Sequence, residues 1–345
     1  MRQKAEKLYP IKDPAGWLPE EIEGNTGWVY QFPENEITEI ISAAKGLVSR
    51  GEDLTKVVKS DFFLPQTAKT FAEIFEELKD GRGFVQMRGL PVSEINRAEA
   101  AAVIWGVGTY FGSPASQNAE GHLLGHVKDL GKDYRDPTVR GYQTKAAMTF
   151  HSDPCDMVAL LCLNKAKSGG ESRVASSVTL YNELLARRPD CVADLCDDFY
   201  WTLHGEISPG QDPWYKMPVF SFLDGFFSAR GASTHARKAQ FLPGAEIWSE
   251  LRQEAVSLYQ KLVPDLAADL PFEQGDLQIL NSHVTLHSRR PYEDWEETDK
   301  KRHLLRLWLN NVALRPVPEI VRENLMGIEV DGFVPKAPLD AEDVV

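Results

Sequence analysis

The chain has 345 residues, of which 43% are hydrophobic and 26% charged, proportions ordinary for a soluble globular protein. A formal net charge of −13 argues against a general nucleic-acid binder, because neutralising phosphates requires a basic surface. We find no secretory signal and no apolar run long enough to span a bilayer, so we expect a cytoplasmic protein with no membrane partner.

The cysteines are too few, and too irregularly spaced, for a disulfide framework or a Cys-x-x-Cys metal site. We predict that Cys155, Cys162, Cys191 and Cys196 are free thiols, mostly packed in the core. Cys155 carries one reservation, because it lies close to the motif described below and could line a pocket.

The first third of the chain predicts a helical layer beside a sheet. Residues 1–35 show no sustained period and are expected to wrap the surface. Apolar residues at helical spacing predict helices over 37–47 and 66–78. A strand is expected over 84–90, and Asn96 is placed to cap the next helix.

The stretch 113–145 lacks periodicity and is expected to be a loop that forms a lid or a pocket wall. It contains His122 and His126, whose i, i+4 spacing would suit a metal on a helix. No acidic helper lies between them, so structural or substrate-contact roles are favoured over metal binding.

Short strands dominate the chain from residue 147 to 310. The remaining expected elements are strands at 158–163, 173–177, 277–280 and 302–309, a hairpin over 218–229, and helices at 179–187 and 245–262. We predict one domain over 1–345, with a mostly helical wrap over 1–80, a core over 81–310 and an irregular C-terminal tail over 311–345.

The most informative motif is a histidine and a carboxylate two residues apart. On an extended strand, His151 and Asp153 point to the same face and can converge on one ion. His287 is the candidate for a third ligand. Two histidines and one carboxylate that leave the other positions open are typical of non-haem Fe(II) oxygenases. A lone His-x-Asp also arises by chance on exposed strand ends, so the motif needs support from elsewhere.

That support comes from further motifs in order along the chain. With 149–153, they are Gly169-Gly170-Glu171-Ser172, Gly275-Asp276 with Asn281, His287-Ser288-Arg289, and Arg302 to Arg306. Together they resemble the taurine dioxygenase-like (TauD/TfdA) family of Fe(II)/2-oxoglutarate dioxygenases, over roughly residues 80–310. The resemblance implies an α+β, mainly β fold, with a double-stranded β-helix (a cupin-like jelly roll) as its core and flanking helices.

The resemblance also implies roles for single residues. His151, Asp153 and His287 would hold the iron, and Arg302 would bind the C5 carboxylate of 2-oxoglutarate with help from the Ser172 hydroxyl. A guanidinium suits that task, because its fork matches a carboxylate and stays charged when desolvated. Arg306 would meet an anionic group of a small prime substrate such as an amino acid. Molecular oxygen would be the second co-substrate. Whether the protein forms a homo-oligomer is left undecided by the sequence.

The sequence departs from the family pattern at two places, which leaves alternative roles for some of these residues. The turn carries Glu171 and Ser172 where relatives often have Asp and Thr, which keeps the acid and the hydroxyl. An acidic stretch over 293–297 changes the spacing between His287 and the arginines, so either arginine of the pair could hold the C5 carboxylate. A surface salt bridge is the alternative role for Arg306.

Other polar and aromatic residues near the motifs have competing interpretations. His283 shares strand parity with His287 but is expected to pack or to support the site rather than bind metal. Tyr142, Phe150 and Trp308 could form a pocket wall, although aromatic residues at strand positions are more often core.

The resemblance implies oxidation of a C–H bond, with hydroxylation as the default and release of succinate and CO2. Desaturation, ring closure and demethylation use the same ligands. The rivals are a non-haem iron oxidase or cupin-type metal enzyme that does not use 2-oxoglutarate, and a non-catalytic protein on the same fold.

Overall fold

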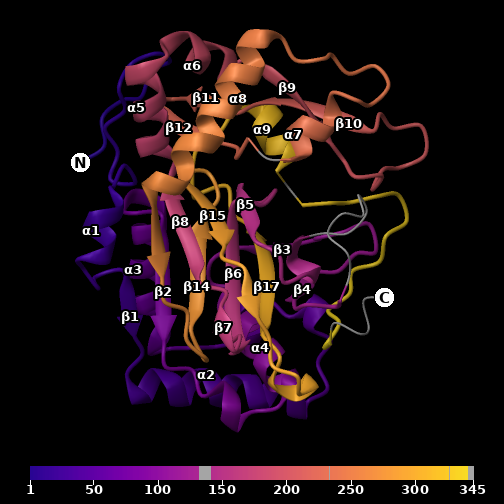
Figure 1. The fold of residues 1–345 in the computed structure, drawn as a ribbon. Helices are drawn as coiled ribbons and strands as arrows, with labels where there is room; N and C mark the ends of the chain where they lie inside the picture. Colours follow the sequence, from indigo (N-terminus) through magenta and orange to yellow (C-terminus); the bar gives the residue numbers. More distant parts are fainter. Residues whose placement is uncertain (132–140, 233, 326, 341–345) are drawn as a thin grey trace.

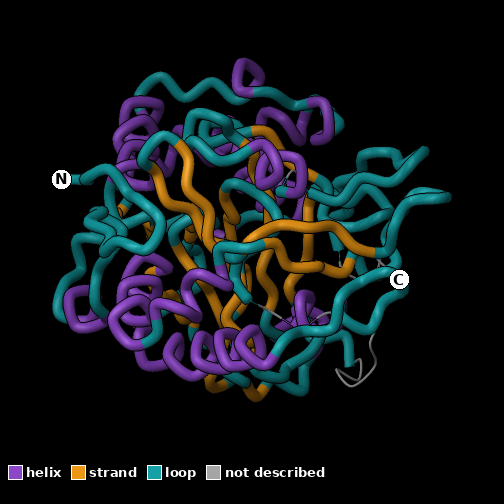
Figure 2. Tube along the Cα trace, turned by 90° about the horizontal axis from the view of Figure 1, so that it is seen from above, coloured by secondary structure: helices purple, strands orange, loops and turns teal. Residues whose placement is uncertain are grey.

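The computed structural model describes residues 1–131, 141–232, 234–325 and 327–340. Two β-sheets lie face to face at its centre, with helices around them (Figure 1). Seen from above, the strands run through the middle of the molecule and the helices lie at the periphery (Figure 2). In the part of the chain that is described, no helix is long and apolar enough to cross a membrane.

The larger sheet has seven strands in the order β1-β2-β14-β6-β17-β3, with β4 also paired to β17. All neighbours are antiparallel except β1 and β2. The strands are β1 (Val29–Gln31), β2 (Phe84–Arg88), β3 (Ser113–Ala115), β4 (Leu124–Val127), β6 (Met157–Asn164), β14 (Leu277–Asn281) and β17 (His303–Asn310).

The smaller sheet has the order β13-β8-β15-β5 and is wholly antiparallel. Its strands are β5 (Met148–His151), β8 (Ser172–Ser176), β13 (Ala267–Leu270) and β15 (Thr285–Arg289). Val174 and Leu270 of this sheet share one buried cluster with Val158, Leu280 and Trp308 of the larger sheet. The two inner faces therefore pack on each other, which is the jelly-roll core that the motifs predicted.

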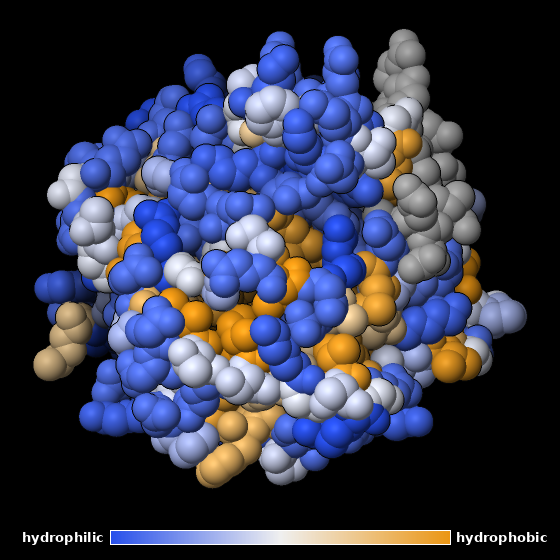
Figure 3. Space-filling model, turned by 90° about the horizontal axis from the view of Figure 1, so that it is seen from below, coloured by the Kyte–Doolittle hydropathy of each residue, from blue (hydrophilic) through white to orange (hydrophobic). Residues whose placement is uncertain are grey.

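Three helices cover the outer face of the larger sheet: α2 (Glu34–Ser49), α3 (Thr67–Asp80) and α4 (Arg97–Gly108). The expected stripe on α3 is confirmed, because Phe71, Ile74 and Leu78 are all buried. Asn96 caps α4 as predicted, and its side chain accepts a hydrogen bond from the backbone N–H of Glu99. Seen from below, the molecular surface is mainly hydrophilic, with a group of apolar side chains near its centre (Figure 3).

A second layer, the cap, covers the end of the barrel and forms one apolar cluster with residues of the smaller sheet such as Ala175 and Leu286. It consists of α5 (Ser177–Arg187), α6 (Pro189–Leu195), α7 (Thr234–Ala239), α8 (Glu250–Leu262), β9 (Asp198–Thr202), β10 (Trp214–Pro218), β11 (Phe220–Leu223) and β12 (Phe226–Ala229). The hairpin expected over 218–229 is confirmed, with positive φ at Asp224 and Gly225 in its turn. The short elements α1 (Pro19–Glu23), β7 (Ser168–Gly169) and β16 (Tyr292–Glu293) lie outside these layers, whereas α9 (Glu319–Asn324) packs against the cap with Val321 in the same apolar cluster.

Three predictions of local structure are wrong. The stretch 113–145 is not all loop, because β3 and β4 both pair with β17. The helix expected from residue 245 begins at Glu250, since the Ser249 side chain caps it and Ile247 is 77% exposed. The expected irregular tail contains α9.

The tail also packs against the core and forms what we call the C-terminal strap, residues 319–325 and 327–340. Arg322 on α9 contacts both carboxylate oxygens of Asp156 at 2.8 Å. The backbone N–H of Gly327 donates to the carbonyl of Pro154. Further along, the backbone of Lys336 bonds to Gly121 and Leu123, beside β4. The strap therefore joins the turn after β5 to the segment that leads into β4.

Candidate metal and co-substrate site

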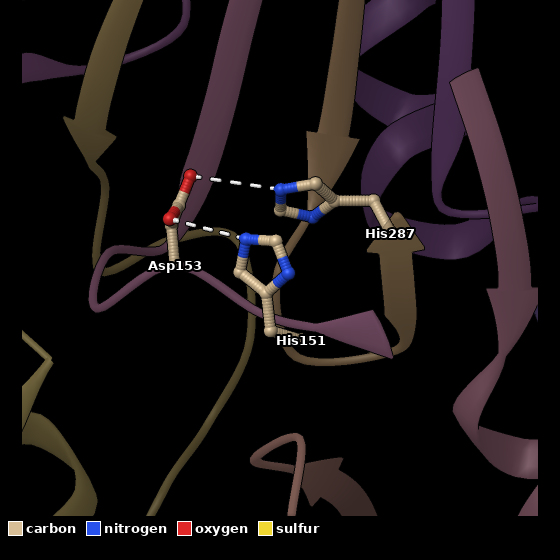
Figure 4. Close-up of side chains that lie close together, drawn as sticks. All are labelled: His151, Asp153 and His287. Atoms are coloured by element: carbon tan, nitrogen blue, oxygen red, sulfur yellow. Dashed lines mark ion pairs between the residues drawn. The ribbon is translucent and has the colours of Figure 1, made fainter. Parts of the chain in front are cut away.

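The structure brings together the three residues that the motif predicted as ligands. His151 ends β5, and its Cα pairs in register with that of His287 on β15. Asp153 lies two residues beyond β5, in the turn rather than on the strand. One ligand atom from each residue lies within 4.8 Å of the other two. Figure 4 shows the two imidazoles side by side and facing the carboxylate.

The carboxylate lies between the two histidines. Nε2 of His151 is 4.0 Å from Oδ1 of Asp153, and Nε2 of His287 is 3.8 Å from Oδ2 (Figure 4). The imidazole centroids are 4.3 Å apart. These separations are too long for direct hydrogen bonds and leave a space bordered by two nitrogen ligands and one oxygen ligand. Imidazole and carboxylate on one face suit Fe(II).

The charges at the site also suit a metal. Burial would raise the pKa of Asp153, but Arg306 and the two histidines outweigh it and lower that pKa to about 2. Burial, with help from His151, lowers the pKa of His287 to about 3, and burial likewise lowers that of His151. The site therefore holds an ionised carboxylate and neutral imidazoles, the forms that bind a metal.

One atom of the carboxylate has no hydrogen-bond partner. Oδ2 of Asp153 is buried and accepts no hydrogen bond in the part of the chain that is described. A buried oxygen without a partner costs free energy unless a ligand satisfies it. The donor set and this atom fit an iron ion.

A close backbone contact holds the ligand segment in place. A Cβ on Gly231 would lie 2.9 Å from Cα of His151 and 3.1 Å from the backbone N of Ser152. The Ser152 hydroxyl accepts a hydrogen bond from the Gly231 N–H, and the backbone carbonyl of Ser152 accepts one from Arg230. The chain after β12 therefore lies directly against the segment that carries both His151 and Asp153.

Arg302 is buried just before β17 and is 5% exposed. Its guanidinium lies 5.2 Å from the ring centroid of Tyr292, and its Nε is close to Gly170, in the Gly-Gly turn. Nη1 is buried without a hydrogen-bond partner, and no carboxylate among the described residues lies within ion-pair distance of the guanidinium. A buried cation of this kind is suited to an anionic ligand.

Ser172, at the start of β8, lies two residues from Gly170 and is 8% exposed. Its hydroxyl donates to Oε1 of Gln278 at 2.9 Å. Gln278 in turn donates to Gln86, which donates to Asp276. The hydroxyl is thus part of a polar network inside the barrel, and its contact with 2-oxoglutarate stays a prediction.

Arg306 lies closer to the metal ligands than Arg302 does. Its Nη1 is 3.8 Å from Oδ2 of Asp153, and its Nε donates to Oε1 of Gln117 at 2.7 Å. The rings of Tyr142 and Trp308 lie 4.6 and 5.1 Å from the guanidinium. Because Arg306 is only 6% exposed, the surface salt bridge considered as its alternative role is wrong.

The aromatic residues near the motifs divide between wall and core. Tyr142 and Trp308 flank Arg306, whereas Phe150 belongs to the apolar core of the cap. Gln117 was not identified from the sequence, because nothing in the pattern of 113–145 distinguishes it. A small pocket beside it is lined by further polar residues of the same stretch, including Asn118, His122 and Gln143.

The histidines outside the triad have other partners. His283 is fully buried and binds Asp156 at 2.7 Å, so it packs away from the metal ligands, as favoured. His122 lies beside Asn118 and Glu120. Among the described residues, one group of histidine and acidic side chains is close enough together to hold a metal, and His122 and His126 are not part of it.

His126 and His303 form a chain of hydrogen bonds. Arg97 donates to Nδ1 of His303, and Nε2 of His303 contacts Nδ1 of His126 at 2.8 Å. Nε2 of His126 contacts the carbonyl of Pro338 in the strap. A guanidinium only donates and a carbonyl only accepts, so both imidazoles must be neutral with the proton on Nε2. Burial, reinforced by Arg97, lowers the pKa of His303 to about 2.

The four cysteines are free, as predicted, and three of them are buried. Cys155 is fully buried, and burial raises the pKa of its thiol. Its Sγ donates to the carbonyl of Met157, so it packs beneath the ligand turn rather than lining a pocket.

Comparison with known proteins gives the family of the chain and confirms its fold. Residues 50–308 match the family model described as "Taurine catabolism dioxygenase TauD, TfdA family". The chain belongs to the TauD/TfdA family of Fe(II)/2-oxoglutarate-dependent dioxygenases. As a TauD/TfdA protein it is an oxidoreductase, and the non-catalytic alternative is removed. The matched range contains the triad and both arginines.

Two curated relatives of this TauD/TfdA protein cover most of its length. FR-33289 synthase of Streptomyces rubellomurinus is 30% identical over 325 residues, 93% of this chain and 96% of the relative. The taurine hydroxylase-like protein SAT17 of Stachybotrys chartarum is 25% identical over 311 residues, 86% and 79% of the two chains.

Solved structures share the TauD/TfdA fold at lower sequence identity. Asparagine oxygenase in complex with Fe(II), 3-hydroxyasparagine and succinate superimposes with a TM-score of 0.64 at 17% identity, covering 88% of this chain and 99% of that one. The non-haem iron oxygenase OrfP with iron and α-ketoglutaric acid gives 0.62 at 13% identity, covering 82% and 94%. These likenesses confirm the predicted fold class.

Proposed function

We propose that this dioxygenase hydroxylates a C–H bond of a small, carboxylate-bearing substrate such as an amino acid. The observation that carries the proposal is Arg306, a buried guanidinium 3.8 Å from the carboxylate of Asp153. A cation beside the metal ligands can hold an anionic substrate while a nearby C–H bond faces the metal. The products would be the hydroxylated substrate, succinate and CO2.

The triad would hold the metal. His151, Asp153 and His287 supply three ligands, and such a set leaves other positions open for co-substrate and oxygen. Bound iron and 2-oxoglutarate supply the oxidising chemistry, in which decarboxylation of the co-substrate drives attack on the C–H bond. The chain's part is to orient the two acids and to exclude water.

Arg302 would bind the C5 carboxylate of 2-oxoglutarate. Its guanidinium is buried, has an unpartnered Nη1 and lies against the Gly-Gly turn. Arg306 is the less suitable of the two arginines for this role, because Gln117 already holds its Nε beside Asp153. Ser172 lies near the same turn and would add a hydroxyl once its bond to Gln278 is exchanged.

Arg306 would then meet the anionic group of the prime substrate. Gln117, Tyr142 and Trp308 fix the orientation of its guanidinium from three sides. The neighbours in fold support an amino-acid substrate, since asparagine oxygenase was solved in complex with 3-hydroxyasparagine and OrfP in complex with (3S)-hydroxy-L-arginine.

The test is an anaerobic titration of metal-free protein with Fe(II) and then 2-oxoglutarate, followed by the visible charge-transfer band of the chelated complex. We expect the band in wild type, with an affinity for 2-oxoglutarate that falls roughly ten- to hundredfold in Arg302→Ala, the range for a lost hydrogen bond between charged groups. Arg290→Ala is the matched control, because Arg290 is an exposed arginine paired with Asp269.

Substrate-dependent succinate formation then identifies amino acids that are turned over, and mass spectrometry distinguishes a gain of one oxygen from desaturation. With iron bound, absence of the band would refute the use of 2-oxoglutarate. Equal losses in Arg302→Ala and Arg290→Ala would refute the role of Arg302.

A further inference from the structure

Another buried arginine, which supports the Ser152 carbonyl, lies against the ligand segment, and its positive charge has no role in the site as described so far. Arg230 follows β12 and is 5% exposed. Its Nη1 donates to the carbonyl of Ser152 at 2.8 Å, and its guanidinium lies 5.5 Å from the ring centroid of Trp201. Its Nε is buried with no hydrogen-bond partner. No carboxylate in the described ranges forms an ion pair with it.

Arg230 and Arg306 lie next to neighbouring residues of the segment that carries the proposed metal ligands. Arg230 contacts the residue between the two ligands His151 and Asp153, and Arg306 lies 3.8 Å from the second of them. An anion that reaches Arg306 from the metal side is therefore within the field of Arg230 as well.

The charges do not balance once the iron and the co-substrate are included. Arg230, Arg302 and Arg306 with an Fe(II) ion bring five positive charges, whereas Asp153 and 2-oxoglutarate bring three negative ones. An uncompensated charge in a buried site is expensive, and the usual solution is a ligand of opposite charge. Two positive charges thus stay available to the prime substrate.

We propose that the prime substrate carries two anionic groups, one bound by Arg306 and the other by Arg230. This inference rests on the proposed function and makes its substrate class more specific. It favours an acid with a second carboxylate or equivalent anionic group over a neutral or cationic amino acid. Arg230 is then a specificity-determining residue as well as a support for the Ser152 carbonyl.

The experiment compares matched acids and amides on the anaerobic complex with iron and 2-oxoglutarate. The probes are L-aspartate against L-asparagine, L-glutamate against L-glutamine, and sulfate against chloride at constant ionic strength. Binding is followed by the shift of the charge-transfer band, and by calorimetry on metal-free protein, so neither readout needs turnover. We expect at least one dianionic probe to bind wild type roughly ten- to hundredfold more tightly than its partner.

Arg230→Gln is expected to abolish that preference and to leave the affinity for 2-oxoglutarate unchanged. Arg230→Lys keeps the charge without the fork and should retain part of the preference, so a misfolded glutamine variant does not end the test. Arg237→Gln is the control, because Arg237 is an exposed arginine on α7 in the same cap.

The outcomes separate this inference from the proposed function. A wild-type band with no preference for any dianionic probe overturns the inference alone. A preference that survives Arg230→Gln also overturns it, as does an equal loss of iron and 2-oxoglutarate binding, which would mark Arg230 as a purely structural support. Absence of the band itself counts against the proposed function.

Discussion

Replacing His303 by glutamine is expected to make the free energy of unfolding of the metal-free protein less dependent on pH below pH 7. His303 is 1% exposed, and its pKa is lowered to about 2 by burial and by Arg97. In the unfolded chain a histidine has a pKa of about 6.5, so unfolding takes up a proton wherever the pH lies below that value. The native state therefore loses stability as the pH falls from 6.5 towards 2.

The magnitude follows from the size of that window. One pKa unit corresponds to about 1.4 kcal/mol, so between pH 6.5 and pH 5 a single histidine held neutral contributes about 2 kcal/mol to the loss. Burial also lowers the pKa of His126, which adds to the loss in the same direction. Protonating His126 would place two N–H groups against each other across the 2.8 Å contact, and protonating His303 would place an N–H at Nδ1 against the Arg97 N–H that donates to it.

The assay is urea unfolding of metal-free wild type and His303→Gln at pH 7 and pH 5. The free energy of unfolding of the variant should fall by up to about 2 kcal/mol less between the two pH values than that of wild type. Gln3→Ala is the control, because Gln3 is exposed and has no titratable side chain. An identical pH dependence in wild type and His303→Gln would refute the reasoning.

Three further substitutions test the site and its support. Asp153→Asn keeps the shape but removes the anionic ligand, so iron affinity measured by anaerobic titration should fall at least about tenfold; an unchanged affinity would exclude Asp153 as a ligand. Gly231→Ala places a Cβ 2.9 Å from Cα of His151, and thermal unfolding should report a loss of about 1–3 kcal/mol together with weaker iron binding. Arg322→Gln removes both contacts to Asp156, with an expected loss of about 2–4 kcal/mol in urea unfolding; a neutral effect would show that α9 does not secure the turn.

The sequence was most informative where function depends on local spacing. His151 and Asp153 lie two residues apart, so the backbone brings them together almost regardless of the rest of the fold, and the family motifs then identified His287. The helix α3 was predicted for the same reason, because Phe71, Ile74 and Leu78 follow its own period.

Features that depend on distant partners were missed. β4 is four residues long, includes Gly125 and His126, and becomes a strand because β17 offers it an edge. Gln117 and Arg230 gain their meaning from contacts with Arg306 and Ser152, which are far away in the chain. No local period reports such contacts, and only the packed structure shows them.

The C-terminal strap has a consequence for the order in which the site is made. Asp156, three residues beyond the ligand Asp153, is held by Arg322, which follows it by 166 residues. At usual synthesis rates this separation corresponds to roughly 10 to 30 seconds on the ribosome. His287 is made within that interval. A nascent chain therefore carries two of the three proposed metal ligands well before it has the third, and the third well before the residue that secures the turn.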